Sequence, residues 1–590
     1  MLKPAIAAVL AVYSCTALAS DLDVKNVEHI SVFAHRQAMA QPNVLASISV
    51  LEHVDIMARQ ANDLPELLAQ LVGVNLARDG GRGQNASLYI RGGNTGHTLV
   101  LIDGVRVGTA TLGYKSLAMM PLELIERIEL IRGPRAAFYG ADALAGVIAI
   151  STRRSQTVAI NGNIASYGQM GADISISHTL DNLSLWATVG VNQADGFNIR
   201  PDLDPDNDGY KQKFIKLSAD YHSRLGLWQL KTDVNSGRYQ FDSAWSEQDQ
   251  SDTLTRSHQL GWQQQFGQWQ HQVQLSQSLD NDTPFSANSR SAFITQREEF
   301  SYQTLGHINS ELTLLAGLNW YQEDVAKSAT AYEQTQRNNK AVFTGINYQY
   351  QGLHLDLTAR RDVFRQYGAE NTWQFAAGYQ VSQHWQLRAS RGTAFKVPSF
   401  NALYYPGYAN PDLKPEQARS DEIGLRYHKP QFQLELSWFN RDVTNLIQGV
   451  EQAQNVKLAA ISGIELSLVK QWQQVSTELA YTWLDAKNRS TGTQLERRPE
   501  NTLHWRSSYQ GDTWSLFITA DHQTGTYQGI YSAVENLPSF TLWGLGASYQ
   551  LNTNLVIRSA VKNMFDKQYQ TSAGYATAGA NINLSLSYRL

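Results

Sequence analysis

Cysteine, charge and long apolar runs are all scarce in this chain of 590 residues. Cys15 is the only cysteine, and charged residues make up 17% of the chain, against about 25% in typical soluble domains. Hydrophobic residues reach 42% and the mean hydropathy is −0.36, so neutral polar residues replace the missing charge. This profile excludes an α-helical membrane bundle, which needs repeated apolar stretches of about 20 residues. Because 10% of the residues are aromatic, it also excludes a disordered polyelectrolyte.

Net charge is nearly balanced, with 49 basic against 53 acidic side chains and a formal charge of −4. Nothing in that balance calls for a polyanionic partner, and we expect no nucleic acid to bind. No P-loop pattern is present, so no ATP site is predicted.

The first 19 residues have the pattern of a secretory signal peptide. Lys3 precedes an apolar run over residues 5–11, and Ala17 and Ala19 are small residues of the kind found before a cleavage site. Cleavage after Ala19 would remove Cys15, which leaves no thiol for disulfides, nucleophiles or thiolate metal sites. The alternatives are an N-terminal membrane anchor or a lipid-attachment role for Cys15. We predict an exported protein.

Residues 49–154 have the pattern of a compact mixed α/β domain. The segment from Asp63 to Glu66 opens a short amphipathic helix with leucines on one face, and Gly73 ends it. Four short apolar runs follow at residues 87–90, 98–102, 125–131 and 146–150, each bounded by turn residues.

Residues 155–590 alternate apolar and polar side chains with a period of two. In the last segment, Ile582, Leu584 and Leu586 point one way while Asn583 and Ser585 point the other. A packed sandwich and a membrane barrel both fit this pattern. The polar face carries mainly Gln, Ser, Thr and Asn, with Trp and Tyr near the strand ends, which favours a barrel. Strands in lipid cannot leave an open edge, so the barrel must close. We predict an all-β transmembrane barrel of about 22 antiparallel strands, with residues 49–154 as a plug inside its lumen.

An ordered set of motifs resembles the TonB-dependent outer-membrane receptors over nearly the whole chain after residue 19. In the N-terminal domain they are LYIRGGN (88–94), LVLIDGVR (99–106), IERIELIRGP (125–134), YG (139–140) and AGVI (145–148). In the C-terminal domain they are FKVPSF (395–400), LY (403–404), NPDLKPE (410–416) and NMFD (563–566).

This resemblance implies a plug held reversibly in a water-lined wall, in the bacterial outer membrane. Arginine forks bind carboxylates through two hydrogen bonds, so plug arginines could pair with acids of the barrel. Internal salt bridges within the plug are the alternative. The candidate arginines are Arg91, Arg127, Arg132 and Arg135.

The leader, residues 20–48, contains a short β-prone segment that resembles the TonB box. Such a segment pairs edge to edge with a strand of the TonB energy transducer, and strand addition needs little sequence specificity. The alternative is a leader strand docked on its own plug. The segment comprises Glu28, His29, Ile30, Ser31, Val32, Phe33 and Ala34.

Within the family, the chain most resembles receptors that transport cobalamin (vitamin B12). One reason is the acidic segment DLDPDNDG (202–209), because four carboxylates within seven residues repel one another unless a hard cation such as calcium lies among them. A solvated acidic turn is the alternative. Resemblance implies a structural calcium site in extracellular loops, with ligands from Asn198, Asp204, Asp206, Asp208, Asp242 and Asp252.

Cobalamin carries amides around its rim, so its site needs many neutral hydrogen-bond partners and few charges. By resemblance, the plug loops at residues 76–84 and 109–115 form the floor of this site. The candidate contacts are Gln84, Asn85, Asn94 and Tyr114. The expected partners are TonB, cobalamin and outer-membrane lipid, and we expect the chain to act as a monomer.

Other functions remain open at this stage. A siderophore or haem receptor would share the fold and the coupling to TonB. A passive porin would lack the plug. An outer-membrane enzyme is not favoured, because the chain contains no G-x-S-x-G or H-E-x-x-H pattern.

Overall fold

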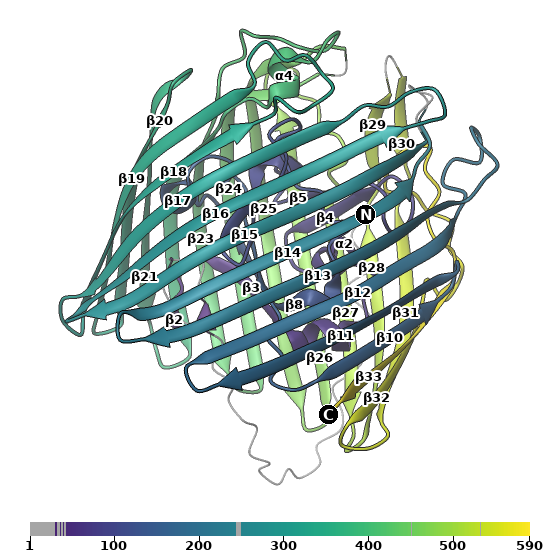
Figure 1. The fold of residues 1–590 in the computed structure, drawn as a ribbon, viewed down its shortest axis with the longest axis horizontal. Helices are drawn as coiled ribbons and strands as arrows, with labels where there is room; N and C mark the ends of the chain where they lie inside the picture. Colours follow the sequence, from purple (N-terminus) through teal and green to yellow (C-terminus); the bar gives the residue numbers. More distant parts are fainter. Residues whose placement is uncertain are drawn as a thin grey trace.

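The computed structural model describes residues 30–31, 36, 39–40, 43–243, 249–449, 451–530 and 533–590. Within these residues, 22 antiparallel strands close into a barrel, and a smaller α/β unit, the plug, lies in its lumen (Figure 1). This confirms the predicted fold class. The predicted signal peptide and most of the leader lie outside the described residues. No helix in the described part of the chain is long and apolar enough to cross a bilayer.

The barrel strands follow one another in space in chain order. They are β10 (Ala159–Ala165), β11 (Gln169–Leu180), β12 (Leu183–Phe197), β13 (Asp208–Ser223), β14 (Gly226–Gln240), β15 (Gln250–Phe266), β16 (Trp269–Phe285), β17 (Phe293–His307), β18 (Leu312–Asp324), β19 (Gln336–Tyr350), β20 (Leu353–Phe364), β21 (Gly368–Gln380), β22 (Trp385–Lys396), β23 (Glu416–Lys429), β24 (Phe432–Gln448), β25 (Gln454–Trp472), β26 (Val475–Asn488), β27 (Asn501–Gln510), β28 (Trp514–Gln523), β31 (Phe540–Gln550), β32 (Leu555–Lys562) and β33 (Asn581–Arg589).

Closure comes from pairing between the first and last barrel strands, β10 and β33, which meet along seven residues from Ala159↔Arg589 to Ala165↔Asn583. On β33 the apolar side chains point outward, as the alternation predicts: Ile582 is 53% exposed and Leu586 is 41% exposed. A face this apolar suits hydrocarbon, and closure leaves no unpaired edge.

The two ends of the barrel differ in the length of their connections. At one end, two-residue turns such as 181–182 and 473–474 join the strands. At the other end the connections are long. The segment 397–415 contains α4 (Phe400–Tyr404), and residues 524–539 contain the hairpin β29 (Thr526–Ile530) and β30 (Ala533–Leu537). We call these the short-turn end and the long-loop end.

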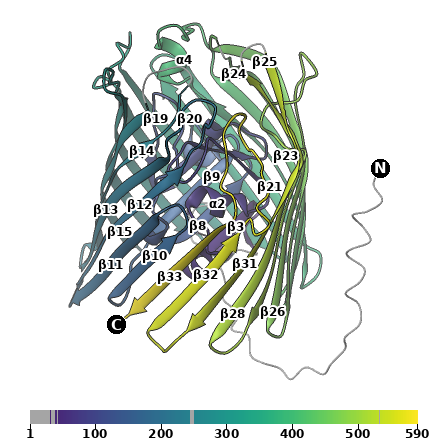
Figure 2. The same ribbon diagram turned by 90° about the vertical axis from the view of Figure 1, so that its right-hand side faces the viewer.

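The plug is built on a five-stranded sheet in the order β3-β8-β9-β6-β7, in which β6 and β9 are parallel. Figure 2 shows β3, β8, β9 and α2 within the barrel. The plug elements are β3 (Ser47–Glu52), α1 (His53–Arg59), α2 (Leu64–Ala69), β4 (Val74–Arg78), β5 (Ala86–Ile90), η2 (Thr95–His97), β6 (Thr98–Ile102), β7 (Val105–Val107), η3 (Leu122–Leu124), β8 (Ile125–Arg132), α3 (Ala136–Tyr139) and β9 (Gly146–Thr152).

The helix predicted from residue 63 onward is α2. The Asp63 side chain accepts a hydrogen bond from the Glu66 backbone N–H at 2.9 Å, and Pro65 occupies the first turn. Leu64, Leu67 and Leu68 are fully buried in the plug core. Burial of each leucine contributes about 1.5–3 kcal/mol, so the plug has an apolar core of its own. A second apolar cluster of the plug is shared with the barrel residues Leu305, Leu315 and Phe343.

Candidate functional site

Buried ion pairs join the plug to one part of the barrel wall. The Arg91 guanidinium donates to Glu465 on β25 at 2.7 and 2.8 Å and to Glu422 on β23 at 2.7 Å. Arg132 Nε lies 3.2 Å from Glu465 Oε2. Gly73 makes room for this cluster, because its φ is +79° and a Cβ there would lie 2.2 Å from Glu465 Oε1. We call these contacts with β23–β25 the fastened side.

The other two predicted arginines lie differently. Arg127 pairs with Glu52, its partner across the β3–β8 ladder, and with Glu129. Both of these ion pairs are internal to the plug. Arg135 does reach the wall, but it donates to the amide oxygen of Gln374 on β21 at 2.9 Å and not to a carboxylate.

Wall contacts to the start of the plug had no sequence signal. Ser47 Oγ donates to Glu422 at 2.7 Å and accepts from Arg388 at 2.7 Å. Arg426 donates to the backbone oxygen of Val44 at 3.2 Å. On barrel strands every second residue faces the lumen and is usually polar. The spacing of residues in the sequence therefore does not distinguish these arginines from other lumen-facing side chains. The structure places them where the leader enters the plug.

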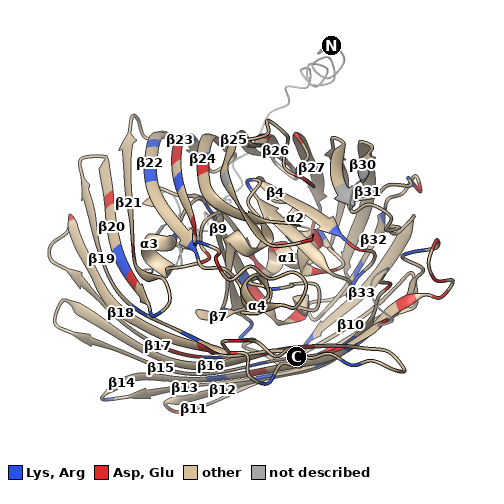
Figure 3. Ribbon diagram, turned by 90° about the horizontal axis from the view of Figure 1, so that it is seen from above, with Lys and Arg blue, Asp and Glu red and all other residues tan. Residues whose placement is uncertain are grey.

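A second ion-pair cluster joins the plug to β13 and β14. Here the acid belongs to the plug and the bases belong to the wall. Asp103, in the turn between β6 and β7, lies 2.7 Å from Lys216 Nζ and 3.4 Å from Lys231 Nζ. Burial raises the pKa of Asp103, but the two ammonium groups more than offset this and lower it well below its usual range. Seen along the barrel, the plug elements lie inside the ring of strands (Figure 3). The plug therefore contacts the wall through acids as well as bases.

Two of the four predicted ligand contacts line a cavity between the plug and the wall strands β13–β17. This cavity has a volume of about 300 Å³, and both Asn85 and Tyr114 line it. Gln84 is buried and donates to the Gln240 backbone oxygen at 2.5 Å. Asn94 is a cap of η2, and its side-chain oxygen accepts a hydrogen bond from Arg498. Asn85 and Tyr114 therefore line one cavity, whereas Gln84 and Asn94 do not line it.

A second cavity, of about 290 Å³, lies between α2 and β4 of the plug and the wall strands β27, β28, β31 and β32. Residues from both ends of the chain line it, among them Gln70 of the plug and His504 and Thr519 of the barrel. The ion pairs here are partly exposed: Glu478 retains 32% of its side-chain exposure in its pair with Arg59. We call this region the cavity side.

The plug loop 109–115 is held from the long-loop end. The backbone N–H groups of Phe400 and Asn401, in α4, donate to the oxygens of Ala110 and Thr111, each at 3.0 Å. Lys396 Nζ donates to the Gly113 oxygen at 2.9 Å. This loop, predicted as part of the ligand floor, is therefore joined directly to a barrel loop.

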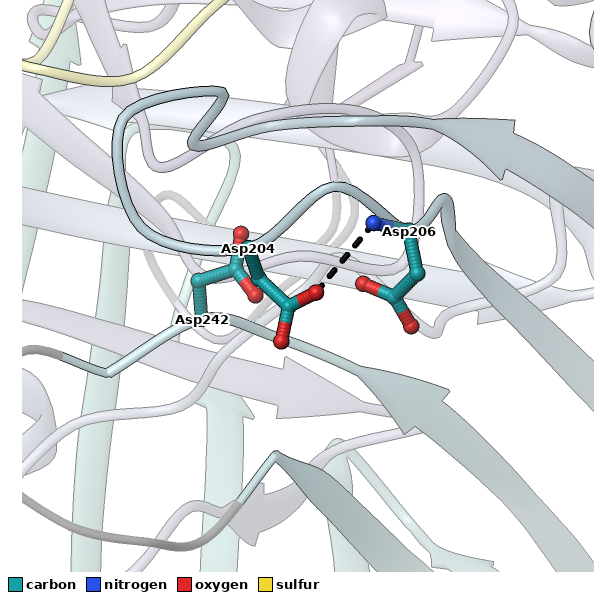
Figure 4. Close-up of side chains that lie close together, drawn as sticks. All are labelled: Asp204, Asp206 and Asp242. Atoms are coloured by element: carbon teal, nitrogen blue, oxygen red, sulfur yellow. Dashed lines mark hydrogen bonds between the residues drawn. The ribbon is translucent and has the colours of Figure 1, made fainter.

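Three of the predicted metal ligands form one cluster. Asp204 and Asp206 lie between β12 and β13, and Asp242 follows β14; one carboxylate oxygen from each lies within 4.8 Å of the others (Figure 4). The Asp206 N–H donates to Asp204 Oδ1 at 3.2 Å. Burial and the charges of Asp204 and Asp206 raise the pKa of Asp242 to about 6. The carboxylates of this cluster therefore repel one another when no cation lies between them.

The fit to a hard cation can be judged from unpaired oxygens. Asn198 Oδ1 and Asp242 Oδ2 are buried and have no hydrogen-bond partner among the described residues. The Asn198 amide nitrogen donates to the Asp204 backbone oxygen at 2.6 Å, so the Asn198 amide lies beside Asp204. Calcium binds carboxylate and carbonyl oxygens, and groups of both kinds are present here.

The remaining two predicted ligands are placed differently. Asp208 lies at the start of β13, where Oδ2 accepts from the Ile199 N–H at 3.1 Å. Asp252 lies outside the cluster, because its cross-strand neighbour on β14 is Arg238, whose Nε is 2.7 Å from Asp252 Oδ1. The assignment of Asp252 as a ligand is therefore corrected: this residue forms an ion pair on the outer face.

Of the predicted TonB box, the structure describes only Ile30 and Ser31. These two residues form β1 (Ile30–Ser31), which pairs antiparallel with β2 (Met39–Ala40). The other five residues of the predicted box, 28–29 and 32–34, lie outside the described residues.

Comparison with known families decides the class of this protein. A model described as "TonB dependent receptor-like, beta-barrel" matches residues 151–564, more than half of the chain, and one described as "TonB-dependent Receptor Plug Domain" matches residues 40–147. The chain belongs to the TonB-dependent receptors. Members of this family are transporters and receptors of the outer membrane, not enzymes, and they interact with TonB and with a transported ligand.

Two curated relatives of this TonB-dependent receptor carry the same name. The "Vitamin B12 transporter BtuB" of Photobacterium profundum is 32% identical over 585 residues, with 95% of each chain covered. The protein of that name from Vibrio vulnificus is 30% identical over 610 residues, with 96% of each chain covered.

Solved structures with the same fold include receptors for other ligands. The siderophore receptor PirA from Acinetobacter baumannii matches with a TM-score of 0.80 at 18% identity, over 92% of this chain and 98% of PirA. A mutant of the ferric enterobactin receptor PfeA from Pseudomonas aeruginosa matches with a TM-score of 0.80 at 19% identity, over 92% and 99%. At these identities the likeness concerns the fold alone. Outer-membrane barrels have short periplasmic turns, so the long-loop end of this receptor faces outward.

Proposed function

We propose that this TonB-dependent receptor takes up cobalamin across the outer membrane. The observation that carries the proposal is the match over 95% of the chain to a relative named as a vitamin B12 transporter, at 32% identity. The cavity beside Asn85 and Tyr114 is lined by charged residues, among them Lys115, Asp280 and Asp282, and also by the neutral hydrogen-bonding groups of Asn235, Thr255 and Ser257, which support the proposal. A ligand with amides around its rim needs partners of this kind.

Calcium is the second part of the proposal. Asp204, Asp206 and Asp242 would hold the ion, with Asn198 Oδ1 as a neutral oxygen donor. Bound calcium supplies positive charge that cancels the repulsion among the carboxylates and so ties the 198–207 loop to Asp242, beyond the end of β14. Loops ordered in advance lose less conformational entropy when the ligand binds.

The leader supplies the connection to TonB. A β-strand formed around residues 28–34 would add to a strand of TonB through backbone hydrogen bonds. A pull on the leader would then reach Val44 and Ser47, which the wall residues Arg426 and Glu422 hold. In this proposal the proton gradient of the inner membrane supplies the energy, and release of the plug contacts opens the passage.

The substrate is tested by equilibrium binding to the detergent-purified receptor. Cyanocobalamin, haem and a ferric siderophore are titrated separately, with calcium present. We expect cyanocobalamin to bind the tightest of the three. If either iron ligand binds more tightly, the substrate assignment is wrong while the assignment to the family stands.

The calcium site is tested with Asp206→Ala, and Asp202→Ala serves as the matched control. Asp202 lies in the same loop but pairs with Arg200 at 2.9 Å, outside the cluster. We expect added calcium to strengthen cyanocobalamin binding in the control and in the wild type, and to have much less effect in Asp206→Ala. An unchanged calcium response in Asp206→Ala would reject the site.

Coupling is tested by deletion of residues 28–34. We expect loss of cobalamin uptake in cells, with cyanocobalamin binding to the purified receptor retained. Loss of binding as well as uptake would refute a role confined to coupling.

A further inference from the structure

The outer face of β13–β15 carries a group of basic side chains close to the long-loop end. Lys211 and Lys213 are exposed on β13, and Lys211 lies directly opposite Arg238 on β14. Asp252 on β15 is in turn opposite Arg238. Arg290, in the adjoining loop 286–292, reaches the same place, with Nη2 3.7 Å from Asp252 Oδ2. We call Lys211, Lys213, Arg238 and Arg290 the basic patch.

The two arginines of the basic patch are fixed in position. Arg238 pairs with Asp252 at 2.7 Å, and both guanidinium groups contact the Phe285 ring, at 4.8 Å and 5.5 Å from its centroid. About half or more of each arginine side chain is nevertheless exposed, 53% for Arg238 and 64% for Arg290. Their remaining N–H donors are therefore held facing outward.

Charge in the basic patch is not balanced by the part of the chain that the structure describes. Asp252 is the only described carboxylate that pairs with it, and no described carboxylate forms an ion pair with Lys211 or Lys213. Like charges directly opposite each other on a sheet destabilise it. Four cations against one anion, with Lys211 facing Arg238, thus leave an excess of positive charge that an external anion would neutralise.

Some exposed bases elsewhere on the outer face have acids beside them. Arg391 lies 3.3 Å from Asp421, and Arg489 lies 3.5 Å from Asp442. Lys487 lies 2.9 Å from Asp485. These three bases are paired with acids, whereas Lys211 and Lys213 have no carboxylate partner among the described residues.

The height of the basic patch places it at the membrane surface. Below it on the same strands come exposed apolar residues, Ile215 and Leu217, and then an aromatic pair, Tyr221 opposite Trp228. Lys211 and Tyr221 are ten residues apart. At about 3.3 Å per residue and a strand tilt of about 40°, this separation corresponds to a height of about 25 Å, the usual height of the apolar band. Tyr221 thus lies at the periplasmic interface and Lys211 at the outer one.

We propose that the basic patch binds the phosphate groups of the glycolipid that forms the outer leaflet of the outer membrane. Arginine forks match phosphate oxygens through paired hydrogen bonds, and the lysines add positive charge beside them. Clusters of lysine and arginine beside an apolar membrane surface bind anionic headgroups in this way. The exposed Ile215 and Leu217 below would contact the acyl chains. This site is independent of the ligand cavity and of the proposed substrate.

The test measures binding of purified diphosphoryl lipid A to the detergent-solubilised receptor by native mass spectrometry. The main variant combines Lys211→Gln and Lys213→Gln, because no described residue forms an ion pair with either lysine and the fold does not depend on them. A second variant, Arg238→Gln, removes one fixed guanidinium. The matched control, Arg391→Gln with Lys487→Gln, removes the same number of charges from another part of the outer face.

We expect the double lysine variant to bind diphosphoryl lipid A about tenfold more weakly than the wild type, with the control unchanged. Arg238→Gln should also weaken binding. Lipid A without phosphates and phosphatidylglycerol should bind the wild type weakly, and inorganic phosphate at millimolar concentration should not compete. Equal losses in the control and patch variants, equal binding of dephosphorylated lipid A, or equal binding of phosphatidylglycerol would each overturn the proposal.

Discussion

The plug meets the barrel wall differently on its two sides. On the fastened side, Arg91 and Glu465 retain only 2% and 3% of their side-chain exposure. On the cavity side, Glu66 and Lys562 retain 29% and 20%, next to a cavity of about 290 Å³. Ion pairs between plug and wall are therefore shielded from water on the fastened side and partly exposed to water on the cavity side.

This difference has energetic consequences. Removal of one partner from a buried ion pair destabilises a protein by about 3–5 kcal/mol, because the other charge stays buried without compensation. An exposed pair contributes about 0–1 kcal/mol. The comparison indicates that the plug is attached firmly to β23–β25 and weakly to β27–β32. Opening a passage beside β27–β32 therefore costs less free energy than opening one beside β23–β25.

The largest expected effect is that of Glu465→Gln, which removes the carboxylate shared by Arg91 and Arg132. We expect the plug to lose about 3–5 kcal/mol of stability. Because Cys15 is the only cysteine in the chain, a thiol introduced as Ala149→Cys, 1% exposed in β9, reports plug opening through its labelling rate in urea. Glu478→Gln, on the cavity side, is the matched control. Equal effects of the two variants would remove the distinction between the sides.

The next effect in size is expected for Asp103→Asn. Lys216 and Lys231 would lose their shared partner, but Lys216 also lines the cavity of about 300 Å³, where water can solvate it. We therefore expect an intermediate loss of about 1–3 kcal/mol in the same labelling assay. A loss as large as that of Glu465→Gln would show that the plug is fastened equally at β13–β14.

Acidification should loosen the plug through His53, which begins α1 and lines a small cavity with Arg558 of β32. Burial, with a smaller contribution from the charge of Arg153, lowers the pKa of His53 to about 4, against about 6.5 when unfolded. The unfolded chain therefore takes up a proton that the folded plug does not, and stability falls as the pH drops from about 6.5 towards 4.

Between pH 7.5 and pH 5 this linkage should reduce plug stability by about 1–2 kcal/mol, after allowance for the partial exposure of His53. The labelling assay at the two pH values measures it. We expect His53→Gln to remove most of the pH dependence. If the variant retains the full dependence, another group titrates and the assignment to His53 is wrong.

The smallest effect is expected for Glu66→Gln, which breaks the ion pair with Lys562 on the cavity side. Both side chains are partly exposed, so we expect a loss of no more than about 1 kcal/mol. A loss of several kcal/mol in the labelling assay would contradict the view that this side is weakly held.

Much of the fold could be predicted because local rules agree with it. Two-residue alternation gave the barrel strands, since lipid and water impose opposite polarity on successive side chains. Asp63 and Pro65 marked the start of α2 for reasons that lie within a single turn. Strand number followed from the length of the alternating region.

The site was harder to predict because its contacts join residues that are hundreds of positions apart. Arg91 and Arg132 could be named from the plug motifs, but the identity of Glu422 and Glu465 depends on strand register around a closed barrel. Asp252 shows the same limit, because a carboxylate near an acidic loop can lie on either face of its strand. A difference of one residue in register reverses that face.

The leader joins the plug at β3, an edge strand that pairs only with β8. A mechanical pull transmitted from residue 44 onward meets the wall contacts of Val44 and Ser47 and, within the plug sheet, has to rupture a single ladder of six residue pairs, Ser47↔Arg132 to Glu52↔Arg127. The remaining four strands, β8-β9-β6-β7, keep all their mutual hydrogen bonds when β3 is peeled away. Force can thus extract one strand while most of the plug stays folded in the pore.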